Sequence, residues 1–444
     1  MARAKKGTAL TPEERLQAAL VPDWEWPYKL PENWCWTTVG AINQYVGISA
    51  DPTKAKNETF ELYSVPSSAD NYPEIVLGAD IGSTKQAVKK GDVLLCKINP
   101  RINRVWKVSK YTDHSLLASS EWIVVRNSRL ISNYLMWCFR SPYFRGYMLS
   151  NVSGVGGSLM RAQPKFVQGY PVPVPPLAEQ QRIVDRIESL FAKLDEAKEK
   201  AQAVVDSFET RKAAILHKAF TGELTAKWRE ERGVSIGNWK TNRFDSVAAI
   251  RSNLVDPAEY QSFPHIAPDN IEKKTGVLLE YHTIAEDGVT SGKHRFYSGQ
   301  ILYSKIRPYL SKAVVVDFDG LCSADMYPIE AYQNARCLWY YMLSDEFLLQ
   351  ASTAGSRSVL PKINQKELSA LTVHLPTNDR EQEEIARILD ELFDKEQRAK
   401  VAAESVLEQI DTIKKSILSR AFRGELGTND PSEESAVELL KQIF

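Results

Sequence analysis

The feature that most constrains this chain is a long amphipathic segment that occurs twice. Residues 179–224 and 381–426 align without a gap at an offset of 202 residues, and about 19 of the 46 aligned positions are identical, which indicates a duplication. Both copies begin with Glu-Gln, and both end with Gly-Glu-Leu shortly after an Ala-Phe pair. The fold must therefore accommodate two versions of one segment.

Apolar residues in each copy recur at spacings that alternate between three and four, which is typical of a helix packed on another helix. Neither copy contains Pro or Gly before its final Gly, so some 40 residues at ~1.5 Å each predict a rod of roughly 60 Å. An isolated amphipathic helix of this length leaves its apolar stripe uncovered, so we expect the two helices to pair, preferably antiparallel. Arg211 interrupts the first seam and Glu396 the second. The predicted seam residues are Ile183, Ile187, Leu190, Leu194, Val204, Phe208, Ile215, Ile385, Leu389, Leu392, Val406, Ile410, Ile413 and Ile417.

Two globular segments of similar length precede the two helices. Asn33-Trp34 and Asn238-Trp239 each open a segment of about 140 residues that ends in Pro before a long helix. The sequence thus predicts an α+β protein with two similar globular domains of mixed α/β structure, separated by two long antiparallel helices. The predicted boundaries are 1–30 for an N-terminal helical segment and linker, 31–175 for the first domain, 176–234 for the central long helix, 235–376 for the second domain, and 377–444 for the C-terminal long helix and tail.

The two globular segments share three landmarks. Residues 91–100 and 299–308, at an offset of 208, each read as a turn glycine and an aliphatic strand stopped by proline. Residues 134–139 and 338–343 read as apolar helices. A Gly- or Ser-rich loop follows each helix and is trailed by Pro-Lys, at Pro164-Lys165 and Pro361-Lys362. Similar scaffolds with different surfaces suggest two binding modules of one type.

Bulk properties narrow the function classes. The formal net charge is zero, but basic residues cluster between Lys85 and Lys110, where Asp92 is the sole acidic residue. No apolar run reaches the roughly 20 residues of a membrane span. The five cysteines are widely spaced and form no C-x-x-C, so we expect reduced thiols in a cytoplasmic protein and no metal site.

Catalytic signatures are absent from the sequence. The stretch 288–294 resembles a phosphate loop but is one residue short and lacks Ser or Thr after its Lys. The stretch 256–260 lacks the second Pro of an amino-methyltransferase D-P-P-Y, and no Gly-rich cofactor loop accompanies it. We therefore expect a noncatalytic chain. Two alternatives remain open: a coiled-coil scaffold or adaptor without DNA binding, and a self-contained DNA-modifying enzyme.

Basic residues at matching landmarks of both domains favour nucleic acid as the ligand. Lys and Arg contact phosphates, and Arg, Lys, Asn and Gln on loops can read base edges. The candidate DNA-binding residues are Lys85, Lys97, Arg101, Arg104, Ser158 and Arg161 in the first domain, and Lys293, His294, Arg295, Lys305, Arg307, Lys312 and Arg357 in the second.

These residues resemble a known family, the specificity subunits of type I restriction–modification enzymes. The resemblance runs over nearly the whole chain and is strongest in the helical repeats. Residues 175–180 (Pro-Pro-Leu-Ala-Glu-Gln) resemble the start of the family's first conserved helix, and residues 218–229 and 420–426 resemble its conserved helix ends. The second end departs from the pattern, because Gly427-Thr428-Asn429 replaces the Thr-Ala-Lys-Trp of the first. The globular domains match only in outline.

The resemblance implies a role as well as a fold. Two target-recognition domains, related by a pseudo-two-fold axis, would each read one half of a split duplex DNA target, and the helix pair would set the unread spacer. Two modification (methyltransferase) subunits and two restriction subunits would dock on this chain. S-adenosylmethionine, ATP and Mg would be bound by those partners, and this chain itself would bind no cofactor.

Overall fold

The computed structural model describes residues 11–154, 160–354 and 361–443, and the chain divides into two compact units. The first unit contains residues 1–200 and 406–444, and the second contains residues 201–405. The compact units therefore do not follow the predicted segments. Each unit combines one globular domain with part of both long helices, because the helices bury their apolar residues partly in the domain cores.

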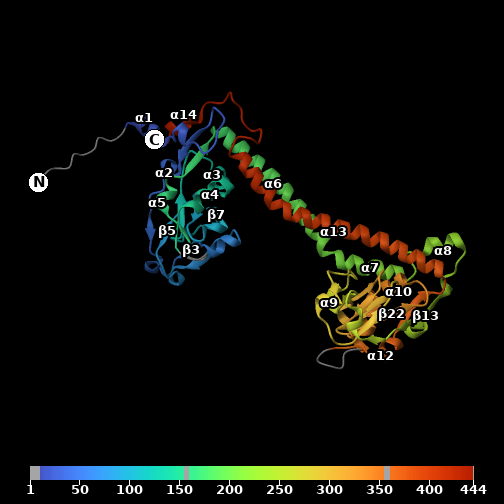
Figure 1. The fold of residues 1–444 in the computed structure, drawn as a ribbon. Coiled ribbons are helices and arrows are strands. Elements are labelled where there is room, and N and C mark those ends of the chain that lie inside the picture. Colours follow the sequence, from blue (N-terminus) through green and yellow to red (C-terminus); the bar gives the residue numbers. More distant parts are fainter. Residues whose placement is uncertain (1–10, 155–159, 355–360, 444) are drawn as a thin grey trace. The chain divides into compact units, whose positions relative to one another are not determined.

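The second predicted long helix forms as one element, whereas the first is interrupted. The helices are α6 (Leu177–Asp206), α7 (Phe208–Phe220), α8 (Ala226–Arg232) and α13 (Asp379–Ala421) (Figure 1). At Ser207, between α6 and α7, the hydroxyl donates to the Ala203 carbonyl at 2.5 Å. Such a side-chain bond to the preceding turn bends helices. The backbone bonds Ser207 N to Ala203 O and Arg211 N to Ser207 O persist, so the distortion is local. The prediction of an unbroken first helix was wrong at this residue.

The long helices pair antiparallel within the second unit. Arg211 donates to Glu396 at 2.8 Å, and the Lys400 ammonium lies 4.9 Å from the centre of the Phe208 ring. The residue number rises along α7 while that of its partner on α13 falls, which confirms the antiparallel pairing. The two polar interruptions of the predicted seam thus face each other as a half-buried ion pair.

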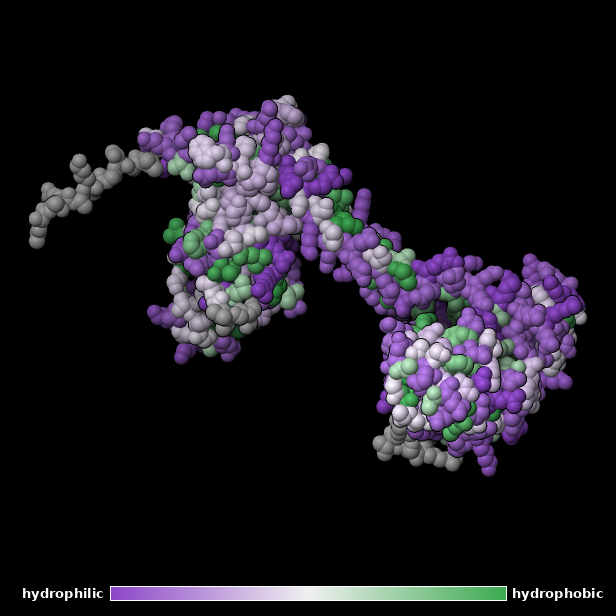
Figure 2. Space-filling model, in the orientation of Figure 1, coloured by the Kyte–Doolittle hydropathy of each residue, from purple (hydrophilic) through white to green (hydrophobic). Residues whose placement is uncertain are grey.

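In the first unit, α6 and the end of α13 also pair, with Lys414 bonded to Asp195 at 2.5 Å. The predicted seam is wrong here at two positions: Val406 is 42% exposed and Ile413 is 41% exposed. Ile410 is buried, and every other predicted seam residue is buried or half-buried. On the face seen in Figure 2, the long helices are mainly hydrophilic, with few hydrophobic residues at the surface.

Three sheets and several short helices form the globular part of the first unit. One sheet has the order β2-β5-β8-β3-β4 with β3 and β8 parallel, the second is β7-β6-β9, and the third pairs β1 with β12. Short strands β10 and β11 form a separate hairpin. The bounds are α1 (Pro12–Ala19), β1 (Cys35–Thr38), α2 (Val39–Ile42), β2 (Ser49–Ala50), β3 (Thr59–Tyr63), β4 (Glu74–Leu77), β5 (Lys85–Ala87), β6 (Val93–Cys96), β7 (Val105–Lys107), β8 (Ser115–Ala118), β9 (Trp122–Val125), α3 (Ser132–Arg140), α4 (Pro142–Ser150), β10 (Val152–Ser153), β11 (Arg161–Ala162), α5 (Pro164–Val167), β12 (Pro171–Val174) and α14 (Ala436–Lys441).

The second unit has a similar topology, with one further strand in its middle sheet and no counterpart of the β10–β11 pair among its described residues. Its sheets are β15-β18-β21-β16-β17 with β16 and β21 parallel, then β14-β22-β19-β20, and β13 paired with β23. The bounds are β13 (Trp239–Arg243), β14 (Ala248–Ile250), β15 (Leu254–Val255), β16 (Pro264–Ile266), β17 (His282–Thr283), α9 (Ile284–Asp287), β18 (Lys293–Phe296), β19 (Ile301–Ser304), β20 (Ala313–Val315), β21 (Gly320–Cys322), β22 (Met326–Ala331), α10 (Ala335–Met342), α11 (Asp345–Ala354), α12 (Gln365–Ala370) and β23 (Thr372–Pro376). The predicted α+β architecture of two similar domains and long helices is confirmed.

Both ends of the described chain pack in the first unit. The Ala436 amide donates to the Asn33 carbonyl at 2.9 Å, and the Asn33 side chain donates to the Asp430 carbonyl at 2.9 Å. Leu16 of α1 and Leu440 of α14 belong to the same buried cluster. The C-terminal tail therefore completes the domain formed by the N-terminal part of the chain.

A buried glutamate near the start of each long helix ties that helix to its domain. Glu381, fully buried, accepts from the Trp239 indole at 3.1 Å, the Thr225 hydroxyl at 2.9 Å and the Arg229 guanidinium at 2.7 Å. All four side chains belong to the second unit. The Glu381–Arg229 contact is thus a buried ion pair.

The equivalent residue of the first unit, Glu179, has a different set of partners. It accepts from the Trp34 indole at 2.8 Å and the Thr428 hydroxyl at 3.3 Å. Burial raises the pKa of the Glu179 carboxyl above its usual value. The nearby Arg182 instead forms a bidentate pair with Glu433. One departure between the repeats is thus the missing arginine on Glu179.

Candidate nucleic-acid interface

Each unit carries one turn that is built in the same unusual way. The turns, residues 97–103 and 305–311, follow the landmark strands β6 and β19. Asn99 and Arg307 have φ near +47° and +48°, and a second left-handed residue ends each turn, at Asn103 and Ser311. Between them Pro100–Ile102 and Pro308–Leu310 form short 3-10 helices. Non-glycine residues adopt positive φ only when the surroundings hold them there, and such residues concentrate at functional sites.

Backbone hydrogen bonds from a second segment hold each turn. In the first unit, Asn99 N donates to Met160 O at 2.8 Å, and Ala162 N donates to Lys97 O at 2.9 Å. The second unit has the same two bonds, from Arg307 N to Pro361 O at 2.7 Å and from Ile363 N to Lys305 O at 2.9 Å. The ladder places Arg161 opposite Ile98, and Lys362 opposite Ile306. Each turn is therefore joined to a segment that carries a further basic residue.

An acidic residue holds this further basic residue in place. Arg161 lies 3.3 Å from Glu121, and Lys362 lies 3.1 Å from Asp325. Both acidic residues are adjacent to the turn lysines through the backbone, because Lys97 N donates to Glu121 O and Lys305 N donates to Asp325 O, both at 3.0 Å. The ion pairs are partly exposed, so they orient the cations more than they stabilise the fold.

The turns expose a set of guanidinium groups. Arg101, Arg161 and Arg307 are exposed, whereas Lys97, Arg104 and Lys305 are half-buried. The Lys305 ammonium donates to the Ala324 carbonyl at 2.5 Å and lies 5.4 Å from the centre of the Tyr327 ring. Exposed arginines on a rigid turn suit both phosphate contacts and bidentate recognition of base edges. The turns are thus candidate DNA-contacting elements.

Two of the predicted DNA contacts, Lys293 and His294 in β18, have buried side chains, so the structure does not support them as surface contacts. Lys293 is 5% exposed and donates to the carbonyl and hydroxyl oxygens of Ser291 at 2.8 and 2.7 Å. His294 is 3% exposed, and burial, with a smaller contribution from the nearby Lys305, lowers its pKa. Burial thus leaves the imidazole little surface with which to contact a phosphate.

Lys85 repeats the arrangement of Lys293, since its ammonium donates to the carbonyl and hydroxyl oxygens of Ser83 at 3.0 and 2.5 Å. The shared offset of these two lysines therefore reflects a local turn. Lys85 is half-buried, so its contact with DNA stays a prediction.

Of the remaining predicted residues, Arg295 lies in β18, Lys312 directly follows the second turn, and two lie outside the described chain. Arg295 packs its guanidinium among three aromatic rings, 4.9 Å from the centre of Tyr297. Lys312 donates to the Pro268 carbonyl at 2.7 Å and lies 3.7 Å from Asp269. Ser158 and Arg357 lie outside the described residues.

Sequence reasoning missed Lys362 as a site residue. A Pro-Lys phrase occurs at both landmarks, but it aligns Lys362 with Lys165. The backbone ladder instead makes Arg161 the counterpart of Lys362, while Lys165 packs on Phe166. Glu121 and Asp325 were also missed, because no sequence signal marks an acidic residue as an orienting partner.

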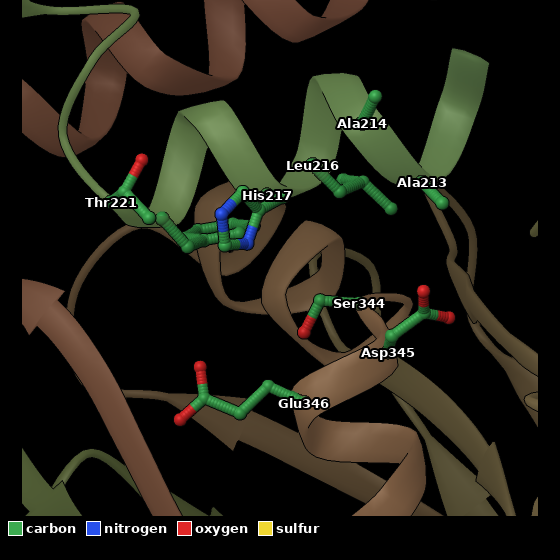
Figure 3. Close-up of a pocket in the computed structure, with 9 residues that line it drawn as sticks. Ala213, Ala214, Leu216, His217, Thr221, Ser344, Asp345 and Glu346 are labelled. Atoms are coloured by element: carbon green, nitrogen blue, oxygen red, sulfur yellow. The ribbon is translucent and has the colours of Figure 1, made fainter. Parts of the chain in front are cut away.

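A separate hollow of about 340 Å³ lies in the second unit beside α7 (Figure 3). His217 of α7 and Thr221, which caps the end of α7, line one side, and Ser344, Asp345 and Glu346, around the start of α11, line the other. Within residues 11–154, 160–354 and 361–443, no group of three or more His, Cys, Asp or Glu side chains could hold a metal ion. None of the residues of the two turns lines this hollow, and we assign no ligand to it.

Among the helices that the structure describes, none combines the length and apolar character needed to cross a membrane. The five cysteines, which are described throughout, are buried and free. Burial raises the pKa of the Cys35 thiol to about 12, so this sulfur is an inert core group.

Comparisons with known proteins identify the family. Residues 237–404 match the model of the type I restriction modification DNA specificity domain. The specificity subunit of the type I restriction enzyme EcoDI from Escherichia coli is 35% identical over 370 residues, which cover 77% of this chain and 82% of that subunit. The EcoKI specificity subunit from Escherichia coli strain K12 is 25% identical over 356 residues, covering 72% of this chain and 73% of that subunit.

Solved structures show the same fold. The HsdS subunit from Thermoanaerobacter tengcongensis superposes with a TM-score of 0.66 at 20% identity, covering 90% of this chain and 100% of that chain. A chain from a structural study of complex assembly and conformational transition of the type I R-M system gives 0.65, also at 20% identity and with the same coverage. The chain belongs to the specificity subunits of type I restriction–modification enzymes.

Proposed function

We propose that this specificity subunit binds a split duplex DNA target, with each unit reading one half. Specificity subunits are noncatalytic, so the contribution of this chain is recognition. The observation that carries the proposal is the repeated turn: residues 97–103 and 305–311 share left-handed residues, backbone ladder and an oriented basic partner, although the surrounding sequences differ. Equal scaffolds with different side chains suit two readers of different half-sites.

The exposed side chains differ between the two turns, as two half-sites require. The first turn carries Arg101 where the second has Tyr309, and the second carries Arg307 where the first has Asn99. Exposed Arg307 can form a bidentate pair with guanine, whereas the Asn99 side chain is half-buried and its Oδ1 is enclosed, so the first turn does not present an equivalent base-reading group at this position. We propose that these positions contribute to the choice of bases.

A half-site experiment tests the assignment. Arg307→Ala should relax base preference in one half of the selected motif only, and Arg101→Ala should affect the other half only. The assay is binding-site selection from random duplex DNA, and Lys198→Ala on the exposed face of α6 serves as the control. The assignment would be refuted if either turn variant left the motif unchanged or weakened both halves equally.

The paired helices supply a spacer between the half-sites. Insertion of four residues after Glu199 in α6, together with four after Gln409 in α13, would lengthen an antiparallel pair by ~6 Å. Since duplex DNA rises ~3.4 Å per base pair, the preferred spacer should grow by at most about two base pairs. An unchanged spacer in the same selection would show that the helices do not set the distance.

We also propose the partners that the family implies: two modification (methyltransferase) subunits and two restriction subunits, acting on DNA in the cytoplasm. S-adenosylmethionine, ATP and Mg would be bound by these partners. A role in a complex is supported by the similar chain that comes from the study of complex assembly of the type I R-M system. Mass measurement of the reconstituted complex would test the stoichiometry, and a complex with a single modification subunit would contradict it.

A further inference from the structure

A groove of about 490 Å³ opens in the first unit where the globular domain meets the long helices. Its walls include Trp137 of α3, Phe191 of α6 and, near the end of α13, Lys414 and Lys415. Ile102, in the first turn, also lines the groove and is 53% exposed. The groove therefore combines aromatic and aliphatic walls with cations.

The second unit contains the same junction, built from residues 202 or 203 positions away along the chain. Trp137 packs on Phe191 with ring centres 5.1 Å apart, as Tyr340 packs on Phe393 at 5.4 Å. The ammonium group of Lys414 lies 5.1 Å from the centre of the Phe191 ring. Its counterpart 202 residues earlier, Lys212, lies 5.6 Å from the centre of the Phe393 ring. The two junctions can therefore be compared position by position.

In the second unit, a segment of the chain itself covers part of this place and leaves a smaller hollow of about 170 Å³. Lys212 donates to the Lys274 carbonyl, and Lys274 N donates to the Leu310 carbonyl at 3.0 Å. Gly276, with φ of +75°, lies so close to the Trp339 ring that a Cβ would overlap it. Lys212 is consequently 7% exposed, and burial lowers its pKa to about 8. A peptide backbone is thus the natural cover for this lysine.

In the first unit, no described segment takes that position, and the cations remain at the groove wall. Arg140 stacks on Trp137 at 5.1 Å and donates to the Val105 carbonyl at 2.8 Å. Arg145 donates to the Arg101 carbonyl, but its Nε is buried and has no hydrogen-bond partner among the described residues. A buried donor without an acceptor is unfavourable, so an acceptor supplied by an occupant would stabilise this side chain.

The charge of the groove indicates the chemical character of a ligand that would bind there. Arg140, Arg145, Lys414 and Lys415 line it, and Asp411 is the sole acidic lining residue. Lys414 already has a carboxylate partner in Asp195, whereas Lys415 is exposed and lines the groove. An occupant that carries acidic side chains would satisfy both the net charge and the unpaired Arg145 donor.

We propose that this groove binds an acidic peptide segment of a partner protein, one segment per chain, in the place that residues 274–277 occupy in the second unit. Backbone carbonyls of the peptide accept from the groove cations, and an apolar side chain packs between Trp137 and Phe191 on one side and Ile102 on the other. This inference is independent of the proposed target recognition, because it uses residues of the junction and not the exposed arginines of the turns.

The test selects a random-peptide phage library against the intact chain and measures the enriched peptides by fluorescence polarisation. Enriched peptides should combine acidic residues with an aromatic or aliphatic residue and bind with a stoichiometry of one. Two variants then examine the groove. Lys415→Glu reverses a charge at an exposed position, and Gly146→Leu places a side chain in the groove, where a Cβ meets no atom within 4 Å.

Each variant should weaken peptide binding by about tenfold or more, which corresponds to at least ~1.4 kcal/mol. Lys218→Glu, on the exposed face of α7 in the second unit, should leave binding unchanged. Peptides without acidic enrichment, or equal affinity of the native chain and both variants, would overturn the proposal. If Lys415→Glu instead lowers DNA affinity while peptide binding is unchanged, the groove is a DNA surface and the proposal is wrong.

Discussion

The buried Arg229–Glu381 pair allows a quantitative test of what holds a long helix to its domain. Glu381 is fully buried, and Arg229 has 10% of its side chain exposed. The guanidinium also donates to the Thr225 hydroxyl and to the Gly222 carbonyl, each at 2.7 Å. Arg229→Met would leave the Glu381 carboxylate buried without its countercharge. Removal of one member of a buried ion pair typically destabilises a protein by about 3–5 kcal/mol, and we expect a loss in this range.

The repeat provides a matched control. Glu179 occupies the equivalent position 202 residues earlier, but its hydrogen-bond donors are the neutral Trp34 indole and Thr428 hydroxyl. Glu179→Gln keeps an oxygen that accepts from the Trp34 indole, and its amide NH2 can donate to the Thr428 hydroxyl oxygen, which reverses that hydrogen bond. No buried cation is left unpaired, so we expect a loss of about 1 kcal/mol or less. The difference between the two variants isolates the effect of the arginine.

Hydrogen exchange measured by mass spectrometry is the suitable assay, because two compact units need not unfold together. Arg229→Met should accelerate exchange in peptides from β13 and β23 and leave β1 and β12 unchanged. The double variant Arg229→Met/Glu381→Gln should recover part of the loss, because no charge is then buried. Equal destabilisation by Arg229→Met and Glu179→Gln, or no recovery in the double variant, would refute this reasoning.

Three further predictions concern DNA affinity, pH and backbone strain. Lys97→Ala should reduce the salt dependence of DNA binding by about one unit of slope between roughly 50 and 200 mM salt, and an unchanged slope would remove this lysine from the phosphate contacts. The raised pKa of Glu179 means that the folded state binds this proton more readily than the unfolded chain, so the native first unit should gain stability relative to Glu179→Gln as the pH falls from neutral towards the ordinary glutamate value of 4.5. A stability difference that does not change with pH, measured by urea unfolding, would contradict this sign. Gly424→Ala should destabilise the first unit by about 1–3 kcal/mol, because Gly424 has φ of +73° and an added Cβ would overlap Pro31. The control Gly427→Ala has a similar φ of +71° but open space around the added Cβ, so it should lose less stability. Equal shifts of the thermal unfolding midpoint would exclude the overlap as the cause.

Local signals in the sequence were enough to predict the long helices, because all the residues that define a helical seam lie within one continuous segment. α13 forms over 43 residues as its uninterrupted pattern predicts. Which residues of each long helix are buried against the other helix was less predictable. Val406 and Ile413 continue the heptad but are exposed, because packing against one specific partner, and not periodicity alone, decides which residues of a wide apolar stripe are covered. Ser207 distorts the first helix through a side-chain bond that no periodicity reveals.

The candidate DNA-contacting turns were likewise predictable from the sequence only in part. Gly91–Pro100 and Gly299–Pro308 could be matched from the sequence, since the turn needs a strand, a left-handed residue and a proline in order. Its basic partners could not be matched, because Arg161 and Lys362 reach the turns through strand pairing across more than 50 residues. Lys293 had the right residue type and offset but points to a local serine.

The amino-acid sequence alone determined that this chain contains two copies of one plan, with long helices, aliphatic landmark strands and basic turns, because each of these is encoded within short windows. Only the tertiary structure decided which cations remain accessible, which carboxylate receives an arginine, and which junction stays open. These outcomes depend on segments that are distant in the chain and become neighbours on folding, and burial then determines whether the same side chain is a contact, a structural anchor or an inert part of the core.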